Sequence, residues 1–393
     1  MMIPERPSLE RRVLTALDGA GGASRIPILL GGCGSGRTSV LLRLRDLLGR
    51  QSCQYINVEA VATTPERFLK GIRASSPFPA LPYGMGASEP GAREAFDAAL
   101  AFLDTARAPG DRPATFLLDE FLELRTFESF PGLRSVLRDL LGVLAASGNR
   151  FVLTSRYVAR AHRLLRDAPA QFELIHVPPL SQLEVRTTLP SGTAGPSDRP
   201  EAAIDDRAQD ELAQVVHALS DGRPLYARLI AEAAGRLGQR QMADPFSALT
   251  ALMAPDGALA AACRFCYELR LHRARGYGAL KAILEVLAAE EPLTLTEIAL
   301  RLSRTPGSTK DYLSWLEDVD LIVSRQKRYS YSDPLLRLWV RLYGRATPPS
   351  DEDLAAEVHA YVLARLPEIE PALAVSGAAA AERDRSWGII EID

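Results

Sequence analysis

The chain has 393 residues, enough for two or three domains, and its 47% hydrophobic and 24% charged residues are usual for a globular protein. Its net charge of −3 excludes a chain-wide electrostatic attraction to nucleic acid or to an anionic membrane, so any such binding has to come from a local patch. The sequence shows neither an apolar leader nor an uncharged apolar run of membrane-spanning length, and its four cysteines are too few for a disulfide framework. We therefore expect a cytoplasmic protein without a membrane partner.

The first part of the chain alternates between helical and strand-like patterns. Apolar residues at helical spacing occur at 8–18, 40–48, 92–107 and 133–146. Short apolar runs that predict strands occur at 25–30, 54–58, 115–121, 150–156 and 172–177. Thr64 followed by Pro65 predicts the start of one further helix, and the prolines, glycines and serines of residues 74–91 predict a loop. This alternation is typical of a parallel α/β sheet.

A glycine-rich turn follows the first predicted strand. Gly31, Gly36 and Thr38 have the spacing of the phosphate-binding loop G-x-x-x-x-G-[K]-[ST], with Arg37 where the pattern has lysine. Polyphosphates are held mainly by backbone N–H groups, which converge only where glycines leave out the Cβ atoms. The N-terminus of the next helix adds partial positive charge, and the Thr38 hydroxyl is placed to bind Mg²⁺.

The candidate nucleotide-binding residues of this turn are Gly31, Gly32, Cys33, Gly34, Ser35, Gly36, Arg37, Thr38 and Ser39. The alternative interpretation is a glycine-rich connection between a strand and a helix that binds no ligand. The residues at the ends of later strands favour the nucleotide site.

Two adjacent carboxylates end the strand predicted at 115–121. The carboxyl ends of strands in an open parallel sheet are where ligands bind. Asp119 is therefore the expected Mg²⁺ ligand beside Thr38, and Glu120 the residue that polarises the attacking water. The strand predicted at 150–156 ends in the same way, in Thr154, Ser155 and Arg156.

Arg156 is suited to a γ-phosphate because its planar guanidinium offers two parallel donors. An arginine after a strand is also commonly a surface charge, and this alternative stays open. Its position after a predicted strand repeats that of Asp119, which supports a role in the same site as the other alternative.

The second part of the chain has the pattern of a helical protein. Residues 190–200 are rich in glycine, serine and proline and predict a linker between domains. Helical patterns follow at 208–219, 225–237, on to about 271, and then at 279–288, 293–302, 308–319 and 351–366. A β-hairpin is predicted at 321–331 with a basic tip, so that three helices and a hairpin between 277 and 345 predict a winged helix-turn-helix.

Cys263 and Cys266 form a single C-x-x-C pair near His272. A structural zinc site needs four ligands, and no second cysteine pair completes this one. We therefore expect the two thiols to be core groups on adjacent turns of a helix.

With these motifs in place, the chain resembles P-loop ATPases of the STAND and AAA+ group, in the layout of the archaeal-type ATPases that end in a winged helix. The resemblance covers about residues 25–345. It rests on the phosphate loop at 31–38, the strand ending Asp119-Glu120-Phe121, the segment Thr154-Ser155-Arg156, the turn Gly222-Arg223-Pro224 and the segment 331–339.

The resemblance implies ATP or ADP with Mg²⁺ as ligands. It implies that Arg156 reads the γ-phosphate and that Gly222 and Pro224 pack near the adenine. The expected fold is a P-loop NTPase parallel sheet sandwiched by helices, followed by an α-helical lid and a winged-helix domain. The expected domains are an N-terminal helix at 1–24, the ATPase core at 25–190, the lid at 191–275, the winged helix at 276–346 and a C-terminal helix and tail at 347–393.

The sequence departs from the family in two places. The Gly-Arg-Glu box that usually precedes the first strand is not evident in residues 1–24. Arg37 replaces the lysine of the phosphate loop, and a large planar guanidinium does not substitute for a compact ammonium. Nucleotide binding can survive this change where fast hydrolysis does not.

Two functions follow from the ATPase core. The first is an ATP-dependent switch in which the lid and winged helix respond to the γ-phosphate, favoured by Asp119, Glu120 and Arg156. The second is a nucleotide-binding scaffold that hydrolyses little and binds a protein partner or a second copy of itself, favoured by Arg37.

A third function is a DNA-binding ATPase. Under this hypothesis the wing residues Arg325, Lys327 and Arg328 contact phosphates of duplex DNA. Against this, the presumed recognition helix and its end carry Asp311, Glu317, Asp318 and Asp320 and only one lysine, Lys310. Such an acidic helix is unsuited to the major groove, so partner binding or a structural role is the favoured use of the winged helix.

Overall fold

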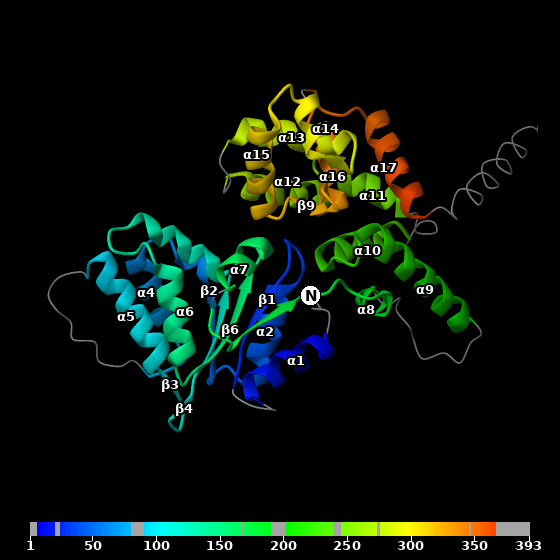
Figure 1. The fold of residues 1–393 in the computed structure, drawn as a ribbon. Coiled ribbons are helices and arrows are strands. Elements are labelled where there is room, and N and C mark those ends of the chain that lie inside the picture. The colour runs from blue at the N-terminus through cyan, green and yellow to red at the C-terminus, as the bar shows by residue number, and fades with distance from the viewer. Residues whose placement is uncertain are drawn as a thin grey trace, which may run out of the picture. The chain divides into compact units, whose positions relative to one another are not determined.

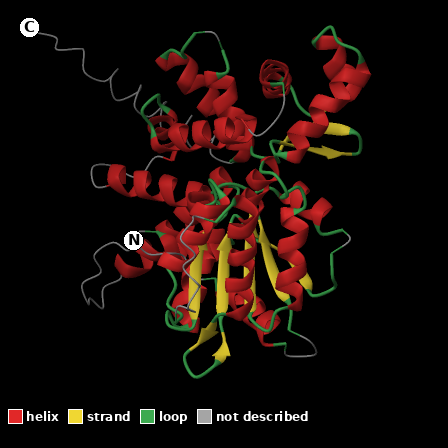
Figure 2. Cartoon of the chain, turned by 90° about the vertical axis from the view of Figure 1, so that its left-hand side faces the viewer, coloured by secondary structure: helices red, strands yellow, loops and turns green. Residues whose placement is uncertain are grey.

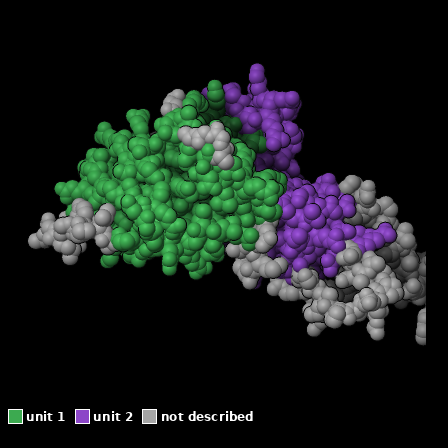
Figure 3. All heavy atoms as spheres, turned by 90° about the horizontal axis from the view of Figure 1, so that it is seen from below, with its two compact units in different colours: residues 1–179, 270–275, 310–323 green, residues 180–269, 276–309, 324–393 purple. Residues whose placement is uncertain are grey.

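The computed structural model describes residues 6–19, 24–79, 90–166, 168–189, 201–238, 245–272, 276–345 and 347–366. The linker predicted at 190–200, the middle of the loop predicted at 74–91 and the tail from 387 to 393 lie outside the described residues. The chain divides into two compact units (Figure 3). The first comprises residues 1–179, 270–275 and 310–323, and the second comprises residues 180–269, 276–309 and 324–393.

A five-stranded sheet forms the centre of the first unit (Figures 1 and 2). Its strands are β1 (Ile26–Leu30), β2 (Cys53–Asn57), β5 (Thr115–Asp119), β6 (Arg150–Ser155) and β7 (Phe172–His176). They lie in the order β2-β5-β6-β1-β7, and every neighbouring pair is parallel. The predicted parallel α/β sheet is confirmed, with its strands within two residues of the predicted bounds.

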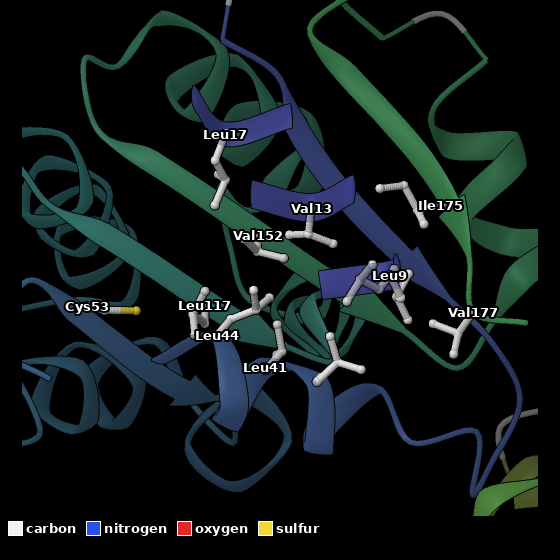
Figure 4. Packing of buried hydrophobic residues seen from close by; sticks show 12 residues of the cluster. Leu9, Val13, Leu17, Leu41, Leu44, Cys53, Leu117, Val152, Ile175 and Val177 are labelled. Atoms are coloured by element: carbon white, nitrogen blue, oxygen red, sulfur yellow. The ribbon is translucent and has the colours of Figure 1, made fainter. Parts of the chain in front are cut away.

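One face of the sheet is covered by α1 (Pro7–Asp18) and α2 (Arg37–Leu48). Leu9, Val13 and Leu17 of α1 pack with Leu41 and Leu44 of α2 over the strands (Figure 4). Their partners from the sheet are Leu29, Leu117, Val152 and Ile175, which belong to four different strands. These strand residues share a face because side chains alternate along a strand and because the register places Leu117 opposite Val152 and Leu29 opposite Ile175.

The opposite face of the sheet carries aromatic side chains. Phe116 and Phe151 precede Leu117 and Val152 by one residue, are fully buried, and stack with ring centroids 5.7 Å apart. Phe102 of α5 packs edge-on against Phe116 at 5.9 Å. Helices therefore enclose the sheet on both sides, which is why β1 and β5 are buried along their whole length.

The other elements of the first part of the chain are α3 (Val58–Val61), α4 (Pro65–Ala74), α5 (Ala92–Thr105), the hairpin strands β3 (Arg107–Ala108) and β4 (Arg112–Pro113), the 3-10 helix η1 (Phe121–Ser129), α6 (Val136–Ala146) and α7 (Val158–Leu164). Thr64 caps α4 as predicted, because its hydroxyl accepts from the N–H of Arg67 and Pro65 is the first helical residue. The helix predicted at 133–146 begins three residues later, at Val136.

The second part of the chain is mostly helical. Its elements are α8 (Gln182–Thr188), α9 (Glu201–Ser220), α10 (Pro224–Gly238), α11 (Pro245–Met253), α12 (Ala258–His272), α13 (Tyr277–Ala289), β8 (Leu293–Thr294), α14 (Leu295–Arg301), α15 (Pro306–Asp318), β9 (Ile322–Arg325), β10 (Arg328–Tyr331), α16 (Pro334–Tyr343) and α17 (Asp351–Arg365). The predicted order of three helices and a hairpin corresponds to α13, α14, α15 and β9–β10. β8 adds a third strand, in the order β8-β10-β9.

Cys263 and Cys266 are buried in α12, in agreement with the predicted role as core groups. Within the described ranges, no group of three or more metal-ligating side chains is found. In the same ranges, no single helix is long and apolar enough to span a membrane. The helices of residues 246–253 and 258–272, bent by 51° relative to each other, reach that length and composition only as a pair.

Candidate functional site

The glycine-rich turn joins the carboxyl end of β1 to α2. Gly34 and Gly36 have φ angles of 73° and 86°, in the left-handed region that favours glycine. A Cβ atom on Gly31 would lie 2.7 Å from Oγ of Ser35, so a side chain at this position would displace Ser35. Gly36 is also the N-cap of α2 and has no side chain to accept from the first N–H groups of that helix. The turn thus leaves donors where an anion binds.

Polar residues from the neighbouring strands gather at this turn. The register places Asp119 opposite Asn57 and Ser155 opposite Leu30, and β5 pairs with β6 through Leu118 and Leu153, so the carboxyl ends of β2, β5, β6 and β1 lie together. The N–H of Gly31 donates to the carbonyl of Ser155 at 3.4 Å. The predicted convergence of these strand ends is therefore present in the structure.

Asp119 accepts hydrogen bonds from three hydroxyl groups. Thr38 Oγ1 and Tyr55 OH lie 2.7 and 2.8 Å from Oδ2, and Thr154 Oγ1 lies 2.5 Å from Oδ1. Burial and the nearby Asp119 carboxylate raise the pKa of Tyr55, which keeps its hydroxyl a donor. Thr38 is exposed whereas Asp119 is only 4% exposed. A threonine hydroxyl beside a carboxylate, next to a glycine turn, fits the oxygen donors that Mg²⁺ takes with a nucleotide.

Glu120 lies just beyond β5 in the left-handed conformation, with φ of 61°. Its N–H donates to Thr154 Oγ1 at 3.0 Å, and its carboxylate is buried between two arginines. Burial by itself raises the pKa of Glu120, but Arg37 and Arg156 more than offset this effect and hold the pKa below its ordinary value. Glu120 is therefore ionised and paired on both sides.

Arg37 contacts the protein through both terminal nitrogens of its guanidinium. Nη1 donates to the carbonyl of Gly32 at 2.6 Å and to Oγ of Ser35 at 3.1 Å. Nη2 donates to Oε1 of Glu120 at 2.5 Å. The side chain is 7% exposed and folds back over the glycine turn. The residue at the lysine position of the motif is thus paired with the carboxylate that was expected to act on water.

Arg156 completes the charged centre of the site. Its N–H donates to Oε2 of Glu120 at 2.9 Å, its Nε lies 3.2 Å from Oε1 of the same residue, and its Nη2 pairs with Glu59. Burial alone lowers the pKa of Arg156, whereas Glu120 and Glu59 raise it well above its ordinary value. With 8% of its side chain exposed, Arg156 belongs to the site and is not a surface charge.

The remaining candidates differ in position. Ser155 is fully buried and its Oγ accepts from the N–H of Tyr157, so its side chain serves the backbone that leads into α7. Cys33 and Ser39 are half-buried in the turn and in the first turn of α2. Gly222, with φ of 64°, and Pro224, the first residue of α10, belong to the second unit.

Sequence reasoning missed two residues of the site. Glu59 follows β2 by two positions and pairs with Arg156, and Tyr55 lies within β2 and donates to Asp119. The strand predicted at 54–58 did contain a signal for a role in the site. Polar groups at the carboxyl end of a parallel strand beside β5 lie at the edge of the sheet where Asp119 and Glu120 lie. The order of the strands, which the sequence leaves open, decides that β2 lies beside β5.

The solved structures that are similar to this chain include three ATPase-related proteins. A Walker-type ATPase of Pyrococcus abyssi matches with a TM-score of 0.59 and 18% identity, over 86% of this chain and 96% of that one. The ORC1 protein of Aeropyrum pernix, solved in complex with DNA, matches at 0.43 and 16%, over 86% and 92%. The RuvB Holliday junction branch migration motor of Thermotoga maritima matches at 0.38 and 12%, over 83% and 92%.

No family model and no curated protein matches the sequence. The likeness to the Walker-type ATPase shows the fold: this chain has the parallel α/β fold of the P-loop ATPases. The activity has to be argued from the site itself, because one fold serves many functions.

Proposed function

We propose that the chain is an ATP-binding molecular switch of the P-loop ATPase class that hydrolyses slowly. The observation that carries this proposal is the Thr38–Asp119 pair, 2.7 Å apart, beside a glycine turn that opens onto the N-terminus of α2. The turn supplies donors for phosphates, and the hydroxyl and carboxylate supply oxygens for Mg²⁺. These features together support a site for the phosphates and Mg²⁺ of a nucleotide.

Slow hydrolysis follows from the pairing of Glu120. A carboxylate that accepts from Arg37 and Arg156 at once is poorly placed to accept a proton from water. The substitution of arginine for the usual lysine acts in the same direction, because guanidinium contacts Glu120 where an ammonium would reach phosphate. Glu120 activates water only after these contacts change.

The second half of the chain supplies the responding elements of the switch, in the manner of STAND ATPases. In this proposal, α9 to α12 form a helical lid and α13 to β10 a winged helix that binds a protein partner. Gly222 and Pro224, at the turn into α10, carry the contact of the lid with the adenine. A nucleotide-dependent change of the lid requires different contacts with ATP and ADP, which only a site near the γ-phosphate provides.

The first test is to denature freshly purified protein and to identify the released nucleotide by anion-exchange chromatography. Released ADP or ATP supports a nucleotide site. An empty site is followed by a titration with Mg²⁺-ATP, and absence of binding in that titration refutes the proposal. Phosphate release is then compared in the parent protein and in Glu120→Gln, where an unchanged rate shows that Glu120 does not act on water.

Duplex DNA is a second candidate partner. The hairpin β9–β10 exposes Arg325, Lys327 and Arg328 at its tip, a local basic patch on an otherwise acidic chain. Two of the four acidic residues that argue against DNA have partners elsewhere, since Asp318 pairs with Arg163 at 2.5 Å and Asp320 accepts from the N–H of Val158 at 2.6 Å. The test is duplex binding at low salt: the DNA proposal requires binding that falls when all three basic residues are replaced by alanine.

A further inference from the structure

Four charged side chains of alternating sign form a continuous chain across the candidate site. Glu59 pairs with Arg156, Arg156 pairs with Glu120 at 3.2 Å, and Glu120 pairs with Arg37 at 2.5 Å. We refer to Glu59, Arg156, Glu120 and Arg37 as the ionic latch. Three of its four side chains are less than 9% exposed, so their charges depend on one another for compensation.

The latch withdraws the cation on which a third phosphate depends. In a phosphate-binding loop the basic residue at the position of Arg37 reaches the β- and γ-phosphates. Here Nη1 of Arg37 contacts Gly32 and Ser35 within the loop, and Nη2 contacts Glu120. A γ-phosphate gains this guanidinium only if Glu120 gives it up.

The carboxylate of Glu120 also opposes a γ-phosphate directly. Both groups are anionic and both compete for Arg37 and Arg156, the arginines that contact Glu120. The β-phosphate, by contrast, is satisfied mainly by backbone N–H groups of the glycine turn, which the latch leaves in place. A diphosphate therefore binds with the latch closed, and a triphosphate has to open it.

We propose that the ionic latch makes this site selective for a nucleoside diphosphate over the corresponding triphosphate. This inference rests on the proposed nucleotide binding and adds the ligand class that the resting site takes. Arg37 and Glu120 act as the specificity-determining pair. Loading the switch with a triphosphate then needs either a high triphosphate concentration or a partner that separates the pair.

The test compares the binding of Mg²⁺-ADP with that of a Mg²⁺-bound β,γ-imido analogue of ATP, by calorimetric titration of the full chain. The analogue keeps hydrolysis out of the measurement. We expect the parent protein to bind ADP about tenfold more tightly, a difference of about 1.4 kcal/mol. In Glu120→Gln the competing charge is gone, so the ratio of the two dissociation constants falls to about one.

Glu128→Gln is the matched control. It removes the same charge from η1, the element that follows Glu120, where Glu128 pairs with Arg125 at 3.2 Å on the surface. The parent ratio is expected to persist in this variant. If Glu128→Gln also lost the preference for ADP, the latch would be refuted, because the removal of any carboxylate would then abolish that preference.

In the titrations of the parent and of Glu120→Gln, three outcomes overturn the inference. Equal affinity of the parent for both nucleotides, or an unchanged ratio in Glu120→Gln, refutes the latch while leaving nucleotide binding intact. Binding of neither nucleotide by the parent or by Glu120→Gln refutes the proposed function and the latch together. The failures of the two proposals are therefore distinguishable.

A measurement without nucleotide tests the coupling of Arg37 and Glu120 through stability, independently of ligand binding. Urea unfolding of the parent, Arg37→Gln, Glu120→Gln and the double variant forms a double-mutant cycle. The latch predicts that the double variant is destabilised less than the sum of the single variants, because each single variant leaves its partner's charge buried. Additive losses would show that Arg37 and Glu120 are not coupled.

Discussion

Thr154 joins the carboxylate of Asp119 to the backbone of Glu120, and its replacement by valine removes that link at constant shape. The hydroxyl donates to Asp119 Oδ1 at 2.5 Å and accepts from the N–H of Glu120 at 3.0 Å. The residue is fully buried in β6, so no solvent water replaces either bond. Thr154→Val therefore leaves the Glu120 N–H without an acceptor and removes one of three donors to Asp119.

The expected loss of stability follows from these two bonds. A buried donor left without its acceptor costs about 1–3 kcal/mol, and a hydrogen bond to a charged group contributes about 1.5–3 kcal/mol. Since the two terms share one hydroxyl, we expect a combined loss of about 3 kcal/mol. For a unit of this size that corresponds to a decrease of about 6–12 °C in the unfolding midpoint.

The assay is thermal and urea unfolding of Thr154→Val beside Thr115→Val. Thr115 is buried at the start of β5, at the far end of the sheet from the site, and receives the same substitution. We expect the larger loss in Thr154→Val, together with slower phosphate release, because the backbone of Glu120 is no longer held. Equal stability of the two variants would refute the reasoning that Thr154 positions the carboxylates.

Three further predictions concern the metal, the loop and the pH response. Thr38→Ala is expected to weaken Mg²⁺-nucleotide binding about tenfold and to leave binding in EDTA unchanged; an equal loss in both titrations would exclude Thr38 as a metal ligand. Arg37→Lys is expected to raise phosphate release with binding retained, because a lysine does not contact the loop and Glu120 together; lost binding would instead show a site built around the guanidinium. Burial raises the pKa of Asp320 to about 6, so its contribution to stability is complete below about pH 4 and is lost as the pH rises through 6. Urea unfolding between pH 4 and 7 should show this decline, of at most about 3 kcal/mol, and Asp320→Asn should abolish it; the same slope in that variant would assign it to another group.

Much of the fold was predictable because its signals are local. The five apolar runs became the five strands of the sheet, and the Thr64-Pro65 start of a helix was found where it was predicted. Such signals depend on side-chain alternation and on capping, which act over a few residues. Ends of elements were less certain, as α6 shows by beginning at Val136 after a 3-10 helix that the pattern did not predict.

The candidate site was predicted in part for the same reason. Gly31, Thr38 and Asp119 were identified from spacing and from their place after strands, and the structure brings Thr38 and Asp119 together. Glu59 was missed because its role depends on reaching Arg156, which lies 97 positions further along the chain. No local pattern records a contact of that range.

The sequence by itself determined which residue types stand at the carboxyl ends of the strands and that an arginine occupies the lysine position of the loop. Only the tertiary structure decided what that arginine contacts. The order β2-β5-β6-β1-β7 places Glu120 between Arg37 and Arg156, so that two residues predicted to act on phosphate and one predicted to act on water are paired with each other. The physical reason is that a charge buried in the fold pairs with the nearest opposite charge. The order of the strands in the sheet determines which charge is nearest.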